Sequence, residues 1–302
     1  MHASFLFLLV STMGTSYATS SESVRRSVTA LSAAELASFA PYTQFARAAY
    51  CGSDALKDWS CGEACDAVSD FEPTLVGGDG DDVQYFFVGY WPSEDAIVVG
   101  HEGTDPTQFE SVLTDIDALQ DNLDTDLFPG VSSDVYVHGG FRDAQASTAS
   151  EILAEVQSLI ESKGTDNLVV VGHSLGGALA ELDGLFFALN IPSASINVVT
   201  YGTPRVGNLA FAELIDSETP NFKRINNKHD LIPILPGRGL GYVHPETEIH
   251  ILEPGSAVAC PGNDDATDSE CQIETVPNIL EGNIVDHLGP YEGIYIGTIF
   301  CY

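Results

Sequence analysis

The sequence predicts an α/β protein whose largely parallel central sheet is flanked by helices, and three observations support that prediction. Strand-like runs of apolar and β-branched residues alternate with helical patterns along the chain. The run at 168–171, near the middle, is continuously apolar, as is typical of a strand buried on both faces of a sheet. That run leads into Gly-x-Ser-x-Gly at 172–176 and then into a helix rich in small residues. No repeat or low-complexity linker divides the chain, so we expect a single domain over 27–302.

The individual elements follow from periodicity and turn signals. The first helix begins with the capping-box pattern Ser32-x-x-Glu35. In chain order, we expect a helix over 31–50, a cysteine-bearing loop over 51–70, a hairpin of strands at 85–91 and 96–100, a short amphipathic helix over 108–119, a strand within 134–141, a long helix over 143–163, the strand and helix around the Gly-x-Ser-x-Gly segment over 167–189, and strands at 196–201, 221–226 and 247–252.

The composition excludes some classes of partner. The formal net charge is −33, and Lys and Arg total only 11 of the 302 residues. Nucleic-acid binding needs a basic surface, so we expect no nucleic-acid partner. Because 44% of the residues are hydrophobic, the acidity indicates a charged surface on a folded protein and not a disordered chain.

The first 26 residues predict processing and export. An apolar run at 5–10 followed by small residues at 16–18 is typical of a secretory signal peptide over 1–18. The pair Arg25-Arg26 is a dibasic processing site, which predicts a pro-segment over 19–26. The apolar run is too short to span a bilayer, and no later stretch is long enough, so we expect no integral membrane segment. The mature protein is therefore expected to be secreted and extracellular.

Six cysteines in a chain expected to be secreted predict up to three disulfides, for which several pairings are possible. Proximity favours two of the pairs, and the third follows from what remains. The expected pairs are Cys61–Cys65, Cys260–Cys271 and Cys51–Cys301. A zinc site is the alternative, but Cys61-x-x-x-Cys65 has no second ligand pair at zinc spacing, so we expect no metal.

Ser174 is the candidate nucleophile. It lies in the strand–turn–helix context that a nucleophile elbow requires, and Gly172 and Gly176 carry no Cβ to hinder the approach of strand and helix. The Leu175 N–H would face the same space as the serine hydroxyl. The alternative is a buried Gly-Ser turn with no chemistry.

A serine hydroxyl needs a base to take its proton, and the base needs a carboxylate to orient it. In chains with this elbow the carboxylate and the histidine follow the serine, which leaves four histidines to consider. His287 lies late in the chain, in a segment that can return over the elbow, and is the preferred base. The alternatives are His229, His244 and His250.

Asp230 is the preferred carboxylate because it follows a predicted strand and precedes an apolar run, where it can be buried and still directed at a partner. Asp216 and Asp286 are alternatives, with a helix cap or a surface position as the competing interpretation. The negative oxygen of the tetrahedral intermediate needs two donors. We expect Leu175 to supply one and Thr104, after Gly103, to supply the other; an ordinary Gly-Thr turn is the alternative.

Several motifs in order resemble those of the fungal (filamentous) class 3 lipase family over most of the chain, roughly 31–302. The segments are Val-His-Gly-Gly-Phe at 137–141, Gly-His-Ser-Leu-Gly-Gly at 172–177, Tyr-Gly-Thr-Pro-Arg-Val-Gly-Asn at 201–208, Asn-Lys-His-Asp-Leu-Ile-Pro at 227–233 and Asp-His-Leu at 286–288. One segment departs from the family. Related lipases usually have Arg-Gly-Ser/Thr before the lid, whereas 101–104 reads His-Glu-Gly-Thr.

The resemblance implies an α/β-hydrolase-like fold and a secreted serine ester hydrolase that needs no cofactor. It implies a lipase acting on tri-, di- or monoacylglycerol esters, often at an oil–water interface, as a monomer. It also implies a mobile lid over about 104–115, whose apolar face is Phe109, Val112 and Leu113. Polar residues interrupt that face, so a feruloyl or aryl esterase acting on plant cell-wall esters remains an alternative. A catalytically inactive binding module is a third hypothesis, which the complete set of Ser, Asp and His disfavours.

Overall fold

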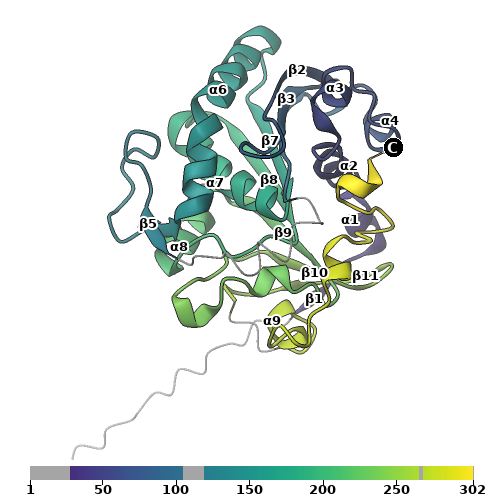
Figure 1. Cartoon of the computed structure of the whole chain (residues 1–302), viewed down its shortest axis with the longest axis vertical. Helices are drawn as coiled ribbons and strands as arrows, with labels where there is room; N and C mark the ends of the chain where they lie inside the picture. Colours follow the sequence, from purple (N-terminus) through teal and green to yellow (C-terminus); the bar gives the residue numbers. More distant parts are fainter. Residues whose placement is uncertain (1–27, 105–118, 265–267, 302) are drawn as a thin grey trace, which may run out of the picture.

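The computed structural model describes residues 28–104, 119–264 and 268–301, which form three layers (Figure 1). Within these ranges a nine-stranded sheet lies between two layers of helices. None of the helices in the described part of the chain is long and apolar enough to cross a membrane. The predicted α/β architecture is confirmed.

The sheet is parallel in its centre and antiparallel at both edges. Its order is β1-β11-β10-β9-β8-β7-β4-β3-β2, and neighbours from β10 to β4 run parallel. The two outer strands on each side pair antiparallel with their neighbours. The strands are β1 (Thr29–Ala30), β2 (Glu72–Gly77), β3 (Phe86–Trp91), β4 (Ala96–His101), β7 (Asn167–His173), β8 (Ser195–Tyr201), β9 (Asn221–Asn227), β10 (Glu248–Glu253) and β11 (Ser256–Cys260), with a separate pair β5 (Gln120–Asn122) and β6 (Tyr136–His138).

Helices α6, α7 and α8 cover one face of the sheet, and α2 covers the other together with α3 and α4 (Figure 1). The helices are α1 (Ala33–Ala37), α2 (Ala40–Ala48), α3 (Gly52–Lys57), α4 (Glu63–Ala67), α6 (Gly139–Lys163), α7 (Leu175–Asn190), α8 (Leu209–Glu218), α9 (Gln272–Thr275) and α10 (Ile284–His287), and the 3-10 turns are η1 (Pro92–Glu94), η3 (Ile232–Ile234), η4 (Arg238–Leu240) and η5 (Thr298–Phe300).

Strand residues alternate between the two hydrophobic cores. Val170 of β7 belongs to the core beneath α6 and α7, whereas Val169 and Val171 belong to the core beneath α2. Successive side chains of a strand point to opposite faces, so an uninterrupted apolar run can fill both cores at once. This is why the strands at the centre of the sheet read as continuous apolar runs.

The predicted helix over 31–50 is wrong in its extent, because the chain forms two helices there. The capping box at Ser32 and Glu35 is present, but α1 ends at Ala37. Pro41 lies in the first turn of α2 and has no N–H to continue a helix from the preceding turn. The expected loop over 51–70 also contains the short helices α3 and α4.

The long helix begins four residues before the predicted start. His138 caps α6, and its Nδ1 accepts a hydrogen bond of 3.3 Å from the Phe141 N–H. A histidine cap followed by Gly139-Gly140 is not a usual helix start signal, since glycine disfavours helix and Ser, Thr, Asp and Asn are the common caps. The predicted helix over 108–119 lies almost entirely outside the described residues.

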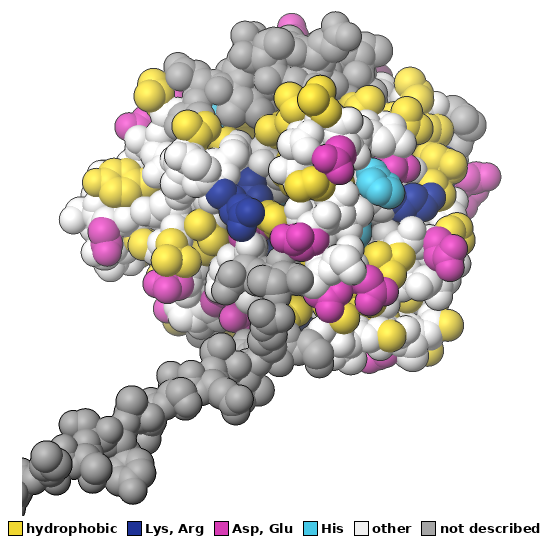
Figure 2. Space-filling view, turned by 90° about the horizontal axis from the view of Figure 1, so that it is seen from below, with side chains coloured by type: hydrophobic (Ala, Val, Ile, Leu, Met, Phe, Trp, Pro, Cys, Tyr) yellow, Lys and Arg dark blue, Asp and Glu magenta, His cyan; other side chains and the backbone are white. Residues whose placement is uncertain are grey.

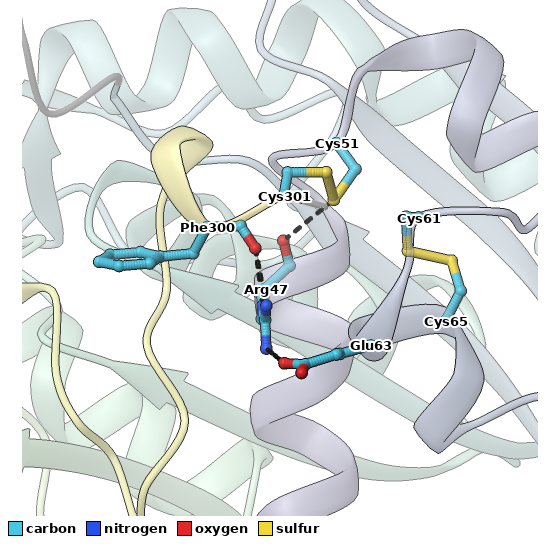
Figure 3. The surroundings of a disulfide bond; sticks show 7 residues. All are labelled: Arg47, Cys51, Cys61, Glu63, Cys65, Phe300 and Cys301. Carbon is cyan, nitrogen blue, oxygen red and sulfur yellow. Dashed lines mark hydrogen bonds and ion pairs between the residues drawn. A yellow bond between two sulfur atoms is a disulfide. The ribbon is translucent and has the colours of Figure 1, made fainter.

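The three disulfides join Cys51 to Cys301, Cys61 to Cys65 and Cys260 to Cys271. Figure 3 shows the first of these beside a second tie between the C-terminal segment and α2. Arg47 donates from Nη2 to the Phe300 carbonyl at 2.7 Å and from Nη1 to Glu63 at 3.2 Å. A covalent bond and a charge-assisted hydrogen bond therefore attach the end of the chain to the N-terminal helices.

Candidate active site

Ser174 lies in a sharp turn between β7 and α7. Its φ and ψ are 60° and −128°, a strained conformation for a residue other than glycine. A Cβ on Gly172 would lie 2.0 Å from the Gly176 carbonyl oxygen, and one on Gly176 would lie 2.3 Å from the His101 carbonyl oxygen. The turn therefore needs glycine at both positions, and this close packing holds the serine in its strained conformation.

His287 and Asp230 form a buried pair on the same side of the sheet. Asp230 follows β9, and His287 is the last residue of α10; the Nδ1–Oδ2 distance is 2.8 Å. Both side chains are fully buried. The second oxygen of Asp230 accepts a hydrogen bond of 2.9 Å from the Ile232 N–H, which fixes the carboxylate relative to the ring.

Two contacts place this pair next to Ser174. The Ser174 N–H donates to the Tyr201 carbonyl at 2.9 Å. A Cβ on the next residue, Gly202, would lie 2.7 Å from both Asp230 Oδ2 and His287 Nδ1. The serine turn and the His–Asp pair thus meet at the carboxyl ends of β7, β8 and β9, as expected for a parallel sheet.

The backbone of His287 is held by two residues that the sequence did not indicate as site residues. Its carbonyl oxygen lies 2.7 Å from His173 Nε2 and accepts a 3.0 Å bond from the Tyr291 hydroxyl. A carbonyl only accepts, so His173 carries its proton on Nε2. Its Nδ1 then accepts from the Tyr50 hydroxyl at 2.7 Å. His173 was visible in the motif as the residue before the serine, but no local pattern marked Tyr50 or Tyr291.

Burial controls the charge of these histidines. It lowers the pKa of His287 to about 3 and raises the pKa of Asp230 above its usual value. Burial, with the nearby His287 ring, also lowers the pKa of His173 well below its usual value. The His287 imidazole is therefore neutral near pH 7, which is the form that can accept a proton.

The loop after β4 lies against the serine. A Cβ on Gly103 would lie 3.0 Å from the Ser174 Cβ and 2.4 Å from the His173 carbonyl oxygen. Thr104 follows directly and is buried, while Leu175 is the first residue of α7 on the other side of Ser174. The two expected oxyanion donors thus come from segments that flank the serine. The expected lid residues Phe109, Val112 and Leu113 lie outside the described residues.

The alternative histidines and acids have other partners. His244 Nε2 lies 2.8 Å from the Pro233 carbonyl oxygen, and both nitrogens of His250 contact backbone carbonyls. Asp216 accepts from the Glu246 N–H, and Asp286 from the His229 N–H at 3.3 Å. These contacts are structural and leave His287 and Asp230 as the pair beside the serine.

Among the described residues, Glu248, Cys260 and Cys271 come close enough to one another to be considered as metal ligands. The two cysteines form a disulfide, so neither offers a thiolate. This cluster therefore does not have the chemistry of a metal centre.

The chain resembles fungal lipases in sequence and in fold. The family model for lipase (class 3) matches residues 98–240. A lipase of Rhizopus niveus is 29% identical over 92% of this chain and 69% of its own length. The secreted mono- and diacylglycerol lipase 3 of Gibberella zeae is 30% identical over 73% of this chain and 71% of its own. The chain belongs to the class 3 lipase family.

Solved structures of lipases agree with this assignment. Lipase II from Rhizopus niveus superposes with a TM-score of 0.79 at 26% identity, covering 90% of this chain and 99% of that one. A triacylglycerol lipase whose catalytic centre is formed by a serine protease triad superposes with a TM-score of 0.78 at 27% identity, covering 90% of this chain and 99% of that one. This class 3 lipase therefore has the α/β-hydrolase fold and is a carboxylic ester hydrolase of the lipase type.

Proposed function

We propose that this class 3 lipase is secreted and hydrolyses acylglycerol esters through an acyl-enzyme on Ser174. The observation that carries the proposal is the buried Asp230–His287 pair, with its 2.8 Å bond, at the sheet edge where the strained Ser174 turn lies. The names of the relatives support the substrate class, since they include mono- and diacylglycerol lipases and a triacylglycerol lipase.

In the proposed acylation step, Ser174 Oγ attacks the ester carbonyl carbon while His287 Nε2 accepts the hydroxyl proton. Asp230, bonded to Nδ1, stabilises the imidazolium that forms. The carbonyl oxygen becomes an oxyanion that receives hydrogen bonds from the Leu175 N–H and from Thr104. Collapse of the tetrahedral intermediate breaks the ester C–O bond, and His287 gives its proton to the leaving alcohol.

Deacylation repeats these roles with water in place of the alcohol. His287 takes a proton from water as the hydroxide oxygen attacks the acyl carbon, and the same donors hold the second oxyanion. The bond to Ser174 Oγ then breaks, the serine recovers its proton from His287, and the fatty acid leaves. The low pKa of His287 supports this cycle because the histidine starts each step as a neutral base.

An exposed apolar segment beside His287 supports the proposal that the substrate is met at an oil–water interface. Ile279, Leu280 and Val285 are 59%, 90% and 61% exposed. On the face shown in Figure 2, apolar side chains lie between acidic ones, and basic side chains are few. With the net charge of −33, this surface favours adsorption to neutral lipid over anionic lipid. We also propose a lid over about 104–115 and a monomeric enzyme. Residues 1–18 would direct export, and cleavage after residue 26 would remove the pro-segment.

Replacing Ser174 tests the nucleophile and the class of activity together. We expect Ser174→Ala to abolish hydrolysis of emulsified triacylglycerol and labelling by a serine-directed phosphonate, with an unchanged circular dichroism spectrum. Full activity in this variant would refute the proposed function. Faster hydrolysis of methyl ferulate than of any acylglycerol in a panel of mono-, di- and triacylglycerols would instead support an aryl esterase, and an unlabelled parent protein would support a binding module.

The role of the exposed segment is tested separately. Leu280→Ser should reduce activity on emulsified triacylglycerol several-fold and leave hydrolysis of a soluble short-chain ester unchanged, because only the emulsion requires adsorption. Ile299→Ser is the matched control: Ile299 is 54% exposed but lies in η5, next to the Cys51–Cys301 disulfide. Equal loss on both substrates, or an equal effect of the control, would contradict the adsorption role.

A further inference from the structure

A second buried His–Asp pair involves β4, which neighbours β7 on the side away from β8 and β9. His101 Nε2 is 2.8 Å from Asp183 Oδ2, and the two side chains are 2% and 0% exposed. The other oxygen of Asp183 accepts a 2.8 Å bond from the side-chain amide of Gln145. We call these three residues the β4–α7 clamp, since they join β4, α7 and α6. No step of the proposed reaction uses them.

The β4–α7 clamp connects the two elements that carry the proposed oxyanion donors. His101 is the last residue of β4 and pairs with Gly172 of β7, and Thr104 follows three residues later. Leu175 begins α7, and Asp183 lies on the same helix about two turns further on. The distance between the Thr104 donor and the Leu175 N–H therefore depends on how β4 is placed against α7, and the His101–Asp183 bond fixes that placement.

Backbone packing at this junction leaves little room for adjustment. A Cβ on Gly176 would meet the His101 and Glu102 carbonyl oxygens at 2.3 and 2.7 Å. On the sheet side, Glu102 exchanges bonds with Tyr85: its N–H donates to the Tyr85 carbonyl at 2.8 Å, and its carboxylate accepts from the Tyr85 N–H at 3.0 Å. The strand end is thus held by Glu102 to Tyr85, the residue before β3, and by His101 to α7.

A hydrogen-bonded pair fixes geometry more tightly than an apolar contact would, because its strength falls steeply with distance and angle. A buried polar pair is costly when its atoms lack partners, and Gln145 and His101 together satisfy both oxygens of Asp183, whereas the Gln145 Oε1 has no hydrogen-bond partner among the described residues. His101 cannot also act as a base toward substrate with the nitrogen that Asp183 occupies. The pair is buried between β4 and α7, with Gln145 of α6 beside it, so its place in the fold suits positioning.

We propose that His101, Asp183 and Gln145 are positioning residues that set the spacing of the two oxyanion donors, Thr104 and Leu175. This inference rests on the proposed function, because it acts through the oxyanion hole. It assigns a role to the segment at 101–104, where the sequence departs from the family. The substrate would not touch the β4–α7 clamp, so its effect should fall on the rate of the chemical step and not on substrate affinity.

The test compares Asp183→Asn with the parent enzyme on a soluble short-chain ester. The asparagine amide donates on one side, so His101 must move its proton from Nε2 to Nδ1, or the Gln145 amide must turn over to accept. Either change alters the bonds that hold β4 against α7. We expect kcat to fall about 10-fold with KM unchanged, which is less than the 10²- to 10³-fold typical of losing a donor outright. The rate of phosphonate labelling at Ser174, which needs the same oxyanion hole, should fall by the same factor.

Two further variants separate positioning from stability. Glu181→Gln is the matched control, since Glu181 is a buried carboxyl on the same helix and burial raises its pKa well above the usual value. It should keep the parent kcat. The triple variant His101→Phe, Asp183→Leu, Gln145→Leu replaces the polar cluster by apolar packing, which is often neutral for stability. We expect it to fold with a parent-like Tm and to retain the low kcat.

The outcomes are distinct. Parent-like kcat and labelling rates in folded Asp183→Asn, or in the triple variant, would overturn the positioning role. If Asp183→Asn does not fold, the triple variant alone decides. Labelling of the parent protein at Ser174 tests the proposed function itself, whereas the ratio of labelling rates between variant and parent tests the β4–α7 clamp.

Discussion

The two buried His–Asp pairs of this lipase have the same bond length and different geometry. In both, a ring nitrogen lies 2.8 Å from a carboxylate oxygen and both side chains are buried. His287 uses Nδ1, the nitrogen near its backbone, whereas His101 uses Nε2, the nitrogen at the far end of the ring. In the proposed mechanism the first carboxylate orients the ring and leaves Nε2 to accept the serine proton. In the second pair the bond takes up Nε2 and ties β4 to α7.

The remaining carboxylate oxygen also differs. In Asp230 it accepts the N–H of Ile232, two residues away, so this oxygen is bonded within its own loop. In Asp183 it accepts the amide of Gln145, so the second pair joins three elements. The roles proposed for the two pairs therefore differ by which ring nitrogen the carboxylate occupies and by whether its second oxygen is bonded within its own loop or to another helix.

The largest effect should come from removing the proposed base. His287→Ala is expected to lower kcat about 10⁶-fold, because no other group can take the Ser174 proton, and residues of a triad act as a unit. Steady-state hydrolysis of a soluble ester would measure it. A loss of less than about 100-fold would mean that another group serves as the base, and the contrast between the two pairs would fail.

The next largest loss of kcat should come from Asp230→Asn, and it distinguishes the role of Asp230 from that of Asp183. Asp230→Asn should lower kcat about 10⁴-fold by favouring the wrong tautomer of His287. That is far more than the effect expected for Asp183→Asn. Both substitutions replace a buried carboxylate by its amide, so each serves as the control for the other in side-by-side kinetics. Similar losses in the two variants would show that the pairs do not have different roles.

Much of the fold and part of this site could be predicted from the sequence, for a physical reason. Ser174, Asp230 and His287 each lie in a short segment whose neighbours constrain it, such as the glycines around the serine. The β4–α7 clamp has no such segment: 82 residues separate His101 from Asp183 and 38 separate Gln145 from it. Gln145 and Asp183 stand between small or apolar neighbours, and nothing in the sequence links either of them to His101, so only the folded chain shows that the three meet.

Helices and strands were likewise predictable where neighbouring residues determine them. The parallel strands were predictable because a residue buried on both faces must be apolar at every position. The start of α6 at Gly139 was not predictable, since its cap is a histidine, whose Nδ1 accepts from the Phe141 N–H. The division of the first helix depends on Pro41, whose effect the apolar periodicity on either side concealed.

The pH dependence should also distinguish the pairs. Burial lowers the pKa of His287 from 6.5 to about 3, and the neutral ring is the active form. Activity is therefore lost only as pH falls through this lowered value, and the acid limb of kcat/KM should lie well below pH 6.5. His101→Gln should lower the plateau of the profile without moving this limb. A limb that moves in His101→Gln would indicate that His101 is the titrating base.

The smallest effect should come from the backbone support of the first pair. Tyr291→Phe removes the 3.0 Å bond to the His287 carbonyl and leaves the His173 bond in place. We expect a loss of about 1 kcal/mol in the free energy of unfolding and a few-fold lower kcat. Urea denaturation followed by fluorescence measures the first. No change in either quantity would show that His173 alone holds that carbonyl.

The Cys51–Cys301 disulfide makes the folded domain a covalent ring, because the bonded residues are 250 positions apart and enclose nearly all of it. In the chain-entropy account, closing so long a loop stabilises the folded state by about 5 kcal/mol. A ring cut once remains one molecule. A protease that nicks an exposed loop anywhere between the two cysteines would leave Ser174 and His287 tethered, and the fragments would separate in an electrophoresis gel only after reduction. For the secreted enzyme proposed above, such a closure would prolong activity after the first cleavage.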